Sequence, residues 1–406
     1  MSTSAPLWRN RDFVLLQAGQ MLSAFGSSAS GIAYPLLALA VTHSAQRAGY
    51  VGAVIFLPLV LLSLPAGMAA DRIDRRALMI GSDAAAAAAV GTLATAAVLH
   101  HTTLWLILVA AFVDSSAGVV FRAGYGGAFR AVVPRSQLAD AASVSQARNA
   151  TVRLAGPPTG GALFGVARSL PFLADAISYA LSTLSLLVMR TRFQEEREPA
   201  ARTDLREGLS YFWRMPFLRT TVGMIAASNF AASGVPYAVI VLATRRGLSG
   251  AAVGAFLALT GATTLLGSTL SPVLRRVLPM RGILLSEFWM AIVYAGFVAV
   301  PSIYVLAAAF ALHAFCFPNT DSAVAAYSYA LIPDRLLGRA MAASNALRAV
   351  TAPLGPLVAG LLLTHTSARV TVLVLAAPVV VAAALGTLSP SLRHLPTLGA
   401  SPAADG

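Results

Sequence analysis

The chain has 406 residues, of which 57% are hydrophobic and only 11% are charged, and its mean hydropathy is +0.74. Soluble proteins carry about 25% charged residues, so this composition excludes an ordinary soluble domain and indicates an integral membrane protein. The net charge is +13 although the sequence contains no lysine, which excludes a P-loop nucleotide site because that motif requires a lysine.

Long apolar stretches follow one another along the chain and predict twelve membrane-spanning helices. Each stretch is close to the roughly 20 residues that a spanning helix needs, and none shows the alternation of a barrel strand. In chain order we expect the spans at 13–41, 48–70, 77–99, 103–129, 139–166, 170–190, 217–243, 250–274, 281–300, 302–330, 338–364 and 369–388. The predicted fold class is therefore an all-α membrane protein.

A polar stretch at 191–216 separates the first six predicted spans from the last six. Within it, the apolar residues of 204–213 recur at helical intervals, which predicts an amphipathic helix on the membrane surface. We therefore expect a six-helix bundle at 1–190, a cytoplasmic linker at 191–216, a second bundle at 217–390 and a cytoplasmic tail at 391–406.

Arginines concentrate in alternate loops. The loops on the side of the N-terminus hold most of them, including the cluster at 190–219, whereas the opposite loops hold only five. Cytoplasmic loops of membrane proteins carry an excess of arginine and lysine, so we expect both termini in the cytoplasm and the protein in the cell membrane. The same distribution explains the positive charge without a nucleic-acid partner.

The two halves of the chain repeat each other's glycine and proline positions. The pair Gly156-Pro157 and the later Gly161 recur 199 residues downstream as Gly355-Pro356 and Gly360. Repeated bundles of this kind pack around a central site, and rocking one bundle against the other opens that site to each side in turn. We therefore expect two pseudo-symmetric six-helix bundles around a central cavity.

A short basic loop joins the second and third spans. Its notable residues are Gly67, Asp71, Arg72, Arg75 and Arg76. Gly67 would permit a close helix contact, and the carboxylate of Asp71 would be favoured beside a helix N-terminus. We expect these residues to gate the path, with the arginines pairing with acidic residues or lipid phosphates. The alternative is that the arginines serve only to orient the chain.

Three motifs together resemble the major facilitator superfamily, and within it the twelve-helix drug:proton antiporter type. They are the loop at 67–76, the sequence Gly-Pro-Pro-Thr-Gly-Gly at 156–161, and the sequence Pro-Asp-Arg-Leu-Leu-Gly-Arg at 333–339. With the segment at 171–179 they are similar to the subgroup of macrolide-efflux proteins and the enterobactin exporter. Two positions depart from the family motifs, because Asp74 and Val152 stand where those motifs have glycine.

The resemblance implies that the fifth span carries an antiporter motif formed by Gly156, Pro157, Gly160 and Gly161. The three glycines lie on nearly one helix face and allow close packing, while the proline can kink the helix. The alternative is an ordinary interface of small residues. The resemblance also implies that Asp71 faces the start of the eleventh span.

Ionisable residues inside the predicted spans are candidates for function because burying them is costly. Asp114 lies near the middle of the fourth span and Asp321 near the middle of the tenth. A carboxylate in a cavity of low dielectric constant binds a proton more readily than one in water. We expect Asp114, and after it Asp321, to carry a coupling proton. The alternative is a static ion pair, such as Asp114 with Arg148.

In the fold that the resemblance implies, spans one, four, seven and ten line the cavity. The candidate cavity and substrate residues are Gln17, Gln20, Arg148, Asn229, His313, Asn319 and Arg348. We expect Asp83 and Glu287 instead to pair with loop arginines near the cytoplasmic face, and Asp175 to be structural. No set of residues predicts catalysis, a metal site or a cofactor site.

The leading hypothesis is proton-driven export of a small amphipathic organic compound, such as a drug, a siderophore or a natural product. We expect a monomer in the lipid bilayer that works by alternating access, with protons and a small-molecule substrate as its partners. Two alternatives remain open: uptake or facilitated diffusion of a small metabolite, and a non-transporting receptor on the same scaffold. An enzyme is not expected.

Overall fold

The computed structural model describes residues 6–191, 193 and 205–393, without the side chains of 205–209, 334 and 335. Within these ranges every regular element is a helix, as the composition predicts. Residues 192 and 194–204 of the predicted linker and 394–406 of the predicted tail lie outside the described residues.

The first half of the molecule consists of six long helices. They are α1 (Arg11–Thr42), α2 (Ala45–Arg72), α3 (Arg75–Val98), α4 (Leu104–Val132), α5 (Leu138–Val166) and α6 (Leu170–Val188). Two short 3-10 turns, Leu7–Arg9 and Arg135–Gln137, precede α1 and α5.

The second half contains spans that are divided into shorter helices. After α7 (Leu205–Arg214), its elements are α8 (Pro216–Arg245), α9 (Gly250–Val277), α10 (Met280–Met290), the 3-10 turn Ala291–Val293, α11 (Tyr294–Ala299), α12 (Ile303–Ala314), α13 (Phe317–Leu331), α14 (Asp334–Ala349), α15 (Leu354–His365), α16 (Ala368–Leu388) and α17 (Pro390–Arg393). Three consecutive pairs, α10 with α11, α12 with α13 and α14 with α15, each form one long apolar span.

Among the described residues, eleven helices or helix pairs are long and apolar enough to cross a membrane, against twelve predicted. The remaining long helix is α5, which has 29 residues but is not among the eleven. It carries Arg148 and Arg153 along its length, and it packs between α1 and α9. A polar helix can lie at the centre of a membrane protein because its neighbours, rather than lipid, surround it.

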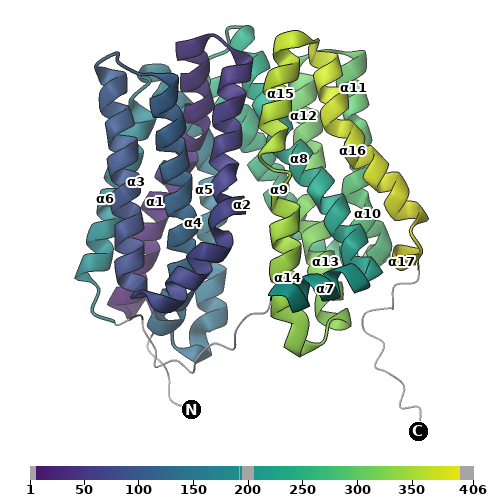
Figure 1. The fold of residues 1–406 in the computed structure, drawn as a ribbon, viewed down its shortest axis with the longest axis horizontal. Coiled ribbons are helices and arrows are strands. Elements are labelled where there is room, and N and C mark those ends of the chain that lie inside the picture. The colour runs from purple at the N-terminus through teal and green to yellow at the C-terminus, as the bar shows by residue number, and fades with distance from the viewer. Residues whose placement is uncertain (1–5, 192, 194–204, 394–406) are drawn as a thin grey trace.

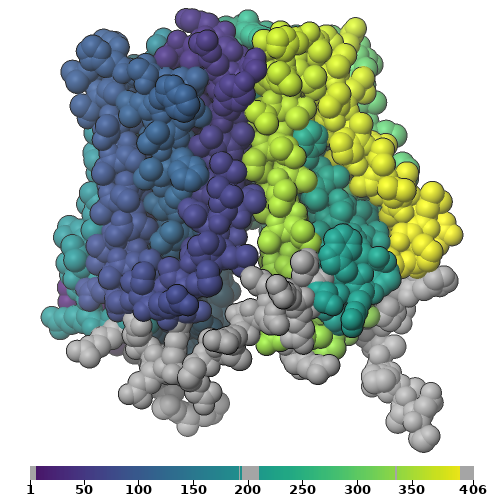
Figure 2. All heavy atoms as spheres, viewed as in Figure 1, coloured from purple at the N-terminus to yellow at the C-terminus, as the bar shows by residue number. Residues whose placement is uncertain are grey.

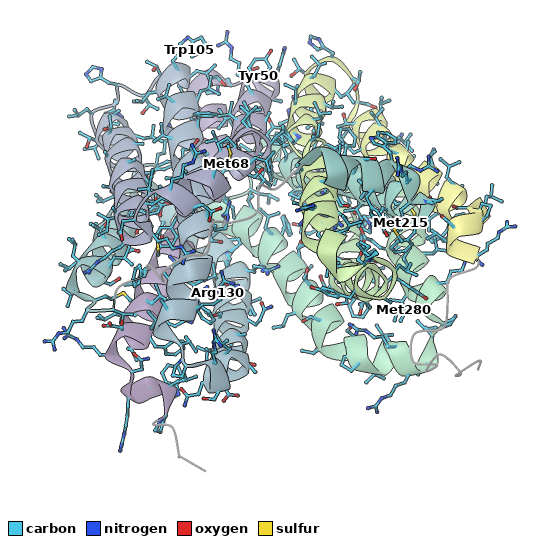
Figure 3. The ribbon with its side chains drawn as sticks, turned by 60° about the horizontal axis from the view of Figure 1, so that its bottom comes forward. Tyr50, Met68, Trp105, Arg130, Met215 and Met280 are labelled. Carbon is cyan, nitrogen blue, oxygen red and sulfur yellow. The ribbon has the colours of Figure 1, made fainter. Side chains whose placement is uncertain are left out.

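Helices α1–α6 form one group and α8–α16 form the other (Figure 1). The start of α1 and the short helix α17 lie toward one end of the molecule, which we call the open end, and α7 lies at the same end against α14. On α7, Phe212 is buried whereas Trp213 is exposed. Figure 3, turned to bring the open end forward, shows Arg130 and Met280 toward that end and Trp105 at the opposite, closed end.

Proline explains where two spans of the second half divide. Helix α13 begins with Pro318 in its first turn, and Pro353 immediately precedes α15. Proline lacks the N–H that would continue a preceding helix. By contrast, α5 runs unbroken through Pro157 and Pro158. The repeated glycine-proline pair therefore lies on a continuous helix in the first half and on a divided span in the second.

The two halves meet at two seams of backbone contact, and both are built on glycine. In the α5–α9 seam, a Cβ atom built on Gly161 would lie 2.0 Å from the carbonyl oxygen of Gly250. In the α2–α15 seam, a Cβ atom built on Gly360 would lie 2.7 Å from the carbonyl oxygen of Ala45. Any side chain at these glycines would force the helices apart, so the glycines permit the halves to close against each other.

Hydrogen bonds reinforce the α2–α15 seam at the closed end. The backbone N–H of Gln46 donates to the side-chain oxygen of Thr364 at 3.1 Å. The hydroxyl of Tyr237 in α8 donates to the carbonyl oxygen of Ala45. Because these residues lie in the first turn of α2 and the last turn of α15, the bonds hold the closed end together.

Toward the open end the two halves separate. Figure 2 shows a narrow gap between α2 and α14 in the lower part of the molecule. A Cβ atom built on Gly67, near the end of α2, would have no described atom of another segment within 4 Å. The close helix contact predicted at Gly67 is therefore absent from this structure, because this end of α2 borders the gap.

Candidate functional site

Three cavities lie where the halves face each other, and together they mark the candidate path. The α2–α14 cavity, of about 530 Å³, is lined by α2, α8 and α14. The Asp114 cavity, of about 680 Å³, is lined by residues of α1–α6. The Arg153 cavity, of about 570 Å³, lies between α5 and the pair α9 and α13. The first two adjoin, because Phe56 and Leu59 line both.

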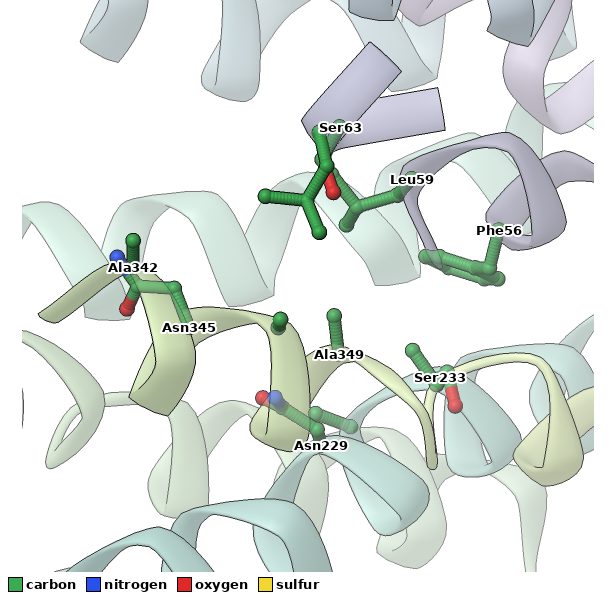
Figure 4. A pocket seen from close by; sticks show the side chains of 12 residues that line it. Phe56, Leu59, Ser63, Asn229, Ser233, Ala342, Asn345 and Ala349 are labelled. Carbon is green, nitrogen blue, oxygen red and sulfur yellow. The ribbon is translucent and has the colours of Figure 1, made fainter. Parts of the chain in front are cut away.

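The α2–α14 cavity has one wall from each half. Figure 4 shows α2 facing α8 and α14 across it, with labelled side chains that include Phe56, Leu59, Ser63, Asn229 and Asn345. None of the residues lining this cavity is charged. Asn229 donates its Nδ2 to the carbonyl oxygen of Arg348 at 2.8 Å. This predicted cavity residue therefore lies on the wall and is held there by the backbone of α14.

Asp114 lies on the wall of the cavity named after it, together with Gln20 and Arg148. Its side chain is only 8% exposed. The hydroxyl of Tyr34 donates to Oδ2 at 3.1 Å, and the hydroxyl of Tyr179 donates to Oδ1 at 2.6 Å. Among the described residues, every hydrogen-bond donor to this carboxylate is thus a neutral tyrosine.

Arg148 is not the partner of Asp114. Its Nη1 donates to Oε1 of Gln17 at 2.7 Å and to the hydroxyl of Tyr125 at 3.3 Å. Gln17 in turn donates its Nε2 to the hydroxyl of Ser145 at 2.8 Å. The ion pair considered from the sequence is therefore absent, because the guanidinium turns toward α1 and the open-end part of α4.

Asp175 belongs to the same network as Asp114, although the sequence suggested only a structural role. It is fully buried in α6 and accepts hydrogen bonds from Ser30 at 2.5 Å and from Ser178 at 3.2 Å. The hydroxyl of Ser27 lies 2.8 Å from the hydroxyl of Tyr179 and 3.5 Å from Oδ1 of Asp175. A chain of hydroxyl groups therefore joins the two carboxylates.

The sequence contained a signal for this network. Asp175 and Tyr179 are four residues apart on α6, and Ser27 and Ser30 are three apart on α1, so each pair lies on one helix face. A Cβ atom built on Gly26 would lie 2.6 Å from Oδ1 of Asp175. The glycine thus lets α1 approach α6 closely enough for the two polar faces to meet.

Two other buried carboxylates do not pair with loop arginines, so that prediction is wrong. Asp83 of α3 is 2% exposed and lines the Asp114 cavity, and its Oδ2 has no hydrogen-bond partner among the described residues. Glu287 of α10 is 4% exposed and accepts a hydrogen bond from Ser228. Both side chains point into helix interfaces instead of toward the loops.

The loop arginines bind backbone carbonyl groups at the end of α6. Arg76 donates to the carbonyl oxygens of Leu187 and Met189, each at 2.7 Å. Arg75 donates to the carbonyl oxygen of Phe193 at 3.2 Å. A cation is favoured at a helix C-terminus, where the carbonyl groups lack helical partners. Among the described residues these bonds are the ones that hold the two arginines, and their pairing with acidic residues or lipid phosphates stays a prediction.

Of the remaining loop residues, Asp74 has a structural role, while the gating role of Asp71 stays a prediction. Asp74 accepts a hydrogen bond from the backbone N–H of Ala77 at 2.8 Å, so it caps α3 and explains an aspartate where the family motif has glycine. Asp71 and Arg72 are the last two residues of α2. The start of α14 includes residues 334 and 335, whose side chains lie outside the described part, so a gate contact of Asp71 there stays a prediction.

The glycines of the predicted antiporter motif lie at helix contacts. A Cβ atom built on Gly156 would lie 2.3 Å from the hydroxyl oxygen of Ser28, and one on Gly160 would lie 2.3 Å from the carbonyl oxygen of Ala29. Gly161 forms the α5–α9 seam described above. The motif therefore packs α5 against α1 within the first half and against α9 of the second half.

Asp321 faces a different environment from Asp114. It lines the Arg153 cavity together with Arg153 of the other half, and its side chain is exposed. The Nε of Arg348 is buried and has no hydrogen-bond partner among the described residues. Charges of both signs thus meet in this cavity.

Two predicted cavity residues lie inside the second half instead. His313 is fully buried, and its Nδ1 lies 3.0 Å from the hydroxyl of Tyr294. Asn319 is buried and donates to the carbonyl oxygen of Phe315 at 3.2 Å. Neither lines any of the three cavities.

Comparison with known families gives a match over almost the whole chain. The model of the MFS_3 family, described as transmembrane secretion effector, matches residues 1–402.

Curated relatives include transporters and efflux proteins. The uncharacterized MFS-type transporter YfiS of Bacillus subtilis is 26% identical over 66% of this chain and 65% of its own length. Macrolide efflux protein A of Streptococcus pyogenes is 24% identical over 53% of each chain. Multidrug efflux pump Tap of Mycobacterium tuberculosis is 27% identical over 53% of this chain and 54% of its own. The chain thus spans about half to two thirds of the length of these relatives.

Solved transporter structures share the fold at low identity. A bacterial homologue of the human lysosomal transporter Spinster, in an inward-facing and unoccupied conformation, has a TM-score of 0.73 and 16% identity, covering 97% of this chain and 98% of its own. A bacterial homologue of the iron transporter ferroportin, in an inward-facing state, has a TM-score of 0.71 and 18% identity, covering 95% and 99%. Because one fold serves many substrates, these likenesses establish the fold alone.

Proposed function

Because the chain belongs to the MFS_3 family of transmembrane secretion effectors, we propose that it exports small amphipathic organic compounds by proton antiport. The substrate enters from the open end and binds where the α2–α14 and Asp114 cavities adjoin. The coupling proton binds Asp114.

The observation that carries this proposal is the environment of Asp114. Its carboxylate is largely buried on a cavity wall, and its only hydrogen-bond donors among the described residues are the neutral hydroxyls of Tyr34 and Tyr179. A buried charge without a cationic partner is costly. Gaining or losing a proton therefore changes the free energy of the cavity strongly, which is what coupling requires.

The walls of the joined cavities suit an amphipathic compound. Apolar side chains such as Phe56 and Leu59 line the α2–α14 cavity, and the adjoining Asp114 cavity adds polar and charged groups, among them Asp114 and Arg148. Apolar walls with a small number of polar groups are typical of small-molecule sites. A cationic group on the substrate would be attracted both to ionised Asp114 and to the aromatic faces. Substrate and proton then compete for one carboxylate.

Transport follows if the bound substrate and the bound proton favour different conformations of the protein. A ligand shifts a conformational equilibrium only through its different affinity for the two states. In the structure described, the glycine seams hold the closed end together while α2 and α14 are apart. Export requires the seams to separate and the open end to close around bound substrate. Protonation of Asp114 then displaces the substrate on the far side.

The direction of export rests on the distribution of arginine. The loop of Arg72, Arg75 and Arg76 and the region around α7 lie at the open end, with the start of α1 and α17. By the positive-inside rule this end faces the cytoplasm, so both termini are cytoplasmic in the cell membrane and the open end faces inward. Each chain encloses its own path, so a monomer is sufficient.

The test is transport into everted membrane vesicles with an imposed pH gradient, screened with antibiotics, dyes and siderophores. We expect at least one compound to accumulate and to be released when the gradient is collapsed. Asp114→Asn should lower gradient-driven accumulation by about tenfold or more, equivalent to roughly 1.4 kcal/mol of coupling. Asp140→Asn is the matched control, because Asp140 is exposed in the first turn of α5.

Other results would select the alternatives. Accumulation that ignores the pH gradient, or movement of compound toward the cytoplasmic side, would contradict proton-driven export in favour of uptake or facilitated diffusion. A phenotype that persists unchanged in Asp114→Asn and Asp321→Asn, with no compound transported, would indicate a receptor.

A further inference from the structure

We propose that Asp175 is the second carboxylate of the proton-binding unit, and that Asp114 and Asp175 share one exchangeable proton through Tyr179 and Ser27. This inference rests on the proposed function and adds a residue, Asp175, that lines none of the three cavities.

The first argument is the continuity of the hydroxyl chain. Oδ1 of Asp114 lies 2.6 Å from the Tyr179 hydroxyl, which lies 2.8 Å from the Ser27 hydroxyl, which lies 3.5 Å from Oδ1 of Asp175. Each interval is within the reach of a hydrogen bond or close to its limit. Three helices, α4, α6 and α1, contribute to the chain, so it is a feature of the folded bundle.

The second argument is a count of hydrogen atoms. Tyr179 and Ser27 have one hydroxyl proton each. While Tyr179 donates to Asp114, Ser27 is left to donate to Tyr179, to the carbonyl oxygen of Ser23 at 2.9 Å or to Asp175. The Ser27 hydroxyl thus has more acceptors in reach than it has protons. Its orientation therefore depends on which of the two carboxylates is ionised.

A proton can pass along this chain with atoms and charge in balance. The O–H bond of protonated Asp114 breaks as its proton moves to the oxygen of Tyr179. Tyr179 releases its own proton to Ser27, and Ser27 releases its own to Asp175, where a new O–H bond forms. Each hydroxyl gains one proton and loses one, and one negative charge moves from Asp175 to Asp114.

The third argument is burial without a cation. Asp175 is fully buried and Asp114 is 8% exposed. Among the described residues, all donors to Asp175 are serine hydroxyls, from Ser27, Ser30 and Ser178. Two ionised carboxylates in one buried network repel each other, so one proton is shared by the pair.

Other titratable groups border the pair without neutralising it. From the helices packed around it these are Tyr34 of α1, Asp83 of α3, Arg122 of α4, Arg148 of α5 and Tyr179 of α6. Among the described residues, neither arginine forms an ion pair or hydrogen bond with Asp114 or Asp175. The substrate can compete only at Asp114, because Asp175 does not line the cavity. Asp175 is therefore a positioning residue, which acts on the substrate site only through the proton that it shares with Asp114.

The test is pH-difference infrared spectroscopy of the full-length protein in lipid, which follows the C=O band of each protonated carboxyl group and needs no substrate. We expect Asp175→Asn to move the titration midpoint of the Asp114 band by about one pH unit or more. Asp114→Asn should move the midpoint of the Asp175 band by a similar amount, because coupling between two sites is reciprocal. Asp140→Asn should move neither.

Two further variants test the hydroxyl chain and cover the case in which Asp175→Asn does not fold. Tyr179→Phe and Ser27→Ala keep both carboxylates, and we expect each to make the two bands titrate independently. Ser185→Ala is the matched control, because Ser185 of α6 bonds only to the carbonyl oxygen of Ser182 among the described residues.

The outcomes separate this inference from the proposed function. An Asp114 band that titrates at the same midpoint with and without Asp175, or with and without the Tyr179 hydroxyl, overturns the shared proton and leaves proton-driven export intact. If the Asp114 band does not titrate in the unmodified protein, both the shared proton and proton-driven export through Asp114 are contradicted.

Discussion

The fourth helix of the first half and its counterpart in the second half carry different ionisable residues at the same position. Leu104 begins α4 and Ile303 begins α12, and this spacing of 199 residues is the same as that of the repeated glycine-proline pair. His313 is therefore the counterpart of Asp114. Both are buried and hydrogen-bonded to tyrosine hydroxyls, Asp114 to two and His313 to that of Tyr294.

The two helices also differ in length and in which ionisable side chain faces a cavity. Helix α4 continues past Asp114 to Val132, whereas α12 ends at Ala314, directly after His313. His313 lines none of the three cavities, and among the described residues of the second half the carboxylate that does line one of them is Asp321. The two halves therefore share the order of their spans. In the first half, a buried carboxylate whose donors among the described residues are all neutral lies on a cavity wall.

The largest expected effect compares the two cavity carboxylates. Asp114→Asn should remove the dependence of transport on the pH gradient, whereas Asp321→Asn should preserve it and change the initial rate by less than about threefold, or roughly 0.7 kcal/mol. The reason is that Asp321 is exposed, whereas Asp114 is largely buried and, among the described residues, accepts hydrogen bonds only from neutral hydroxyls. Initial rates in vesicles with and without a gradient measure both effects. Loss of the gradient response in Asp321→Asn alone would reverse the comparison between the halves.

A second prediction compares the two glycine seams. Gly161→Leu should disrupt the α5–α9 seam more than Gly360→Leu disrupts the α2–α15 seam, because the facing carbonyl oxygen is nearer, at 2.0 Å against 2.7 Å. Overpacking of this kind costs about 1–3 kcal/mol. Separation of the closed end relieves the clash, so the open end should close more often. Slower thiol labelling of Ser63→Cys, which lies in the α2–α14 cavity, would report this shift.

The control for the seams lies on the same helix. Gly165→Leu of α5 should leave the labelling rate unchanged, because a Cβ atom there meets no described atom of another segment within 4 Å. Equal slowing by Gly165→Leu and Gly161→Leu would show that the seam does not govern the conformational equilibrium.

The smallest expected effect compares two arginines in equivalent places. Arg76, at the start of α3, donates to the carbonyl oxygens of Leu187 near the end of α6 and of Met189 just after it. Arg281, at the start of α10, donates to a single carbonyl oxygen, that of Thr387 in α16, at 2.8 Å. Arg76→Gln should lower the free energy of unfolding by about 1–2 kcal/mol, and Arg281→Gln by roughly half as much. Thermal unfolding in detergent measures the difference, with Arg276→Gln, exposed at the end of α9, as the control. A larger loss in Arg281→Gln would contradict this order.

Local features of the sequence predicted much of the architecture. Long apolar runs identified the spans, and eleven of them qualify as spans in the structure. The motifs at 67–76 and 156–161 identified the family, which the match over 1–402 confirms. The glycines of the second motif were expected at close contacts and are found there. These features depend on hydropathy and on residue size, which are properties of a segment by itself.

Contacts between distant helices could not be predicted in the same way. The sequence placed Asp83 and Glu287 near loop arginines, and it assigned Asp175 a structural role. In the structure Asp83 and Glu287 point into helix interfaces, and Asp175 joins Asp114 through Tyr179. Each of these contacts depends on the direction in which a helix turns its polar face.

The sequence alone thus determined that the chain is a duplicated set of membrane helices with a basic end and a glycine-rich fifth span. Only the tertiary structure decided which polar side chains meet, which carboxylate lacks a cationic neighbour and which glycines close a seam. The physical reason is that the 3.6-residue period of a helix assigns each side chain to a face. The neighbour that the face meets depends on the rotation and spacing of packed helices.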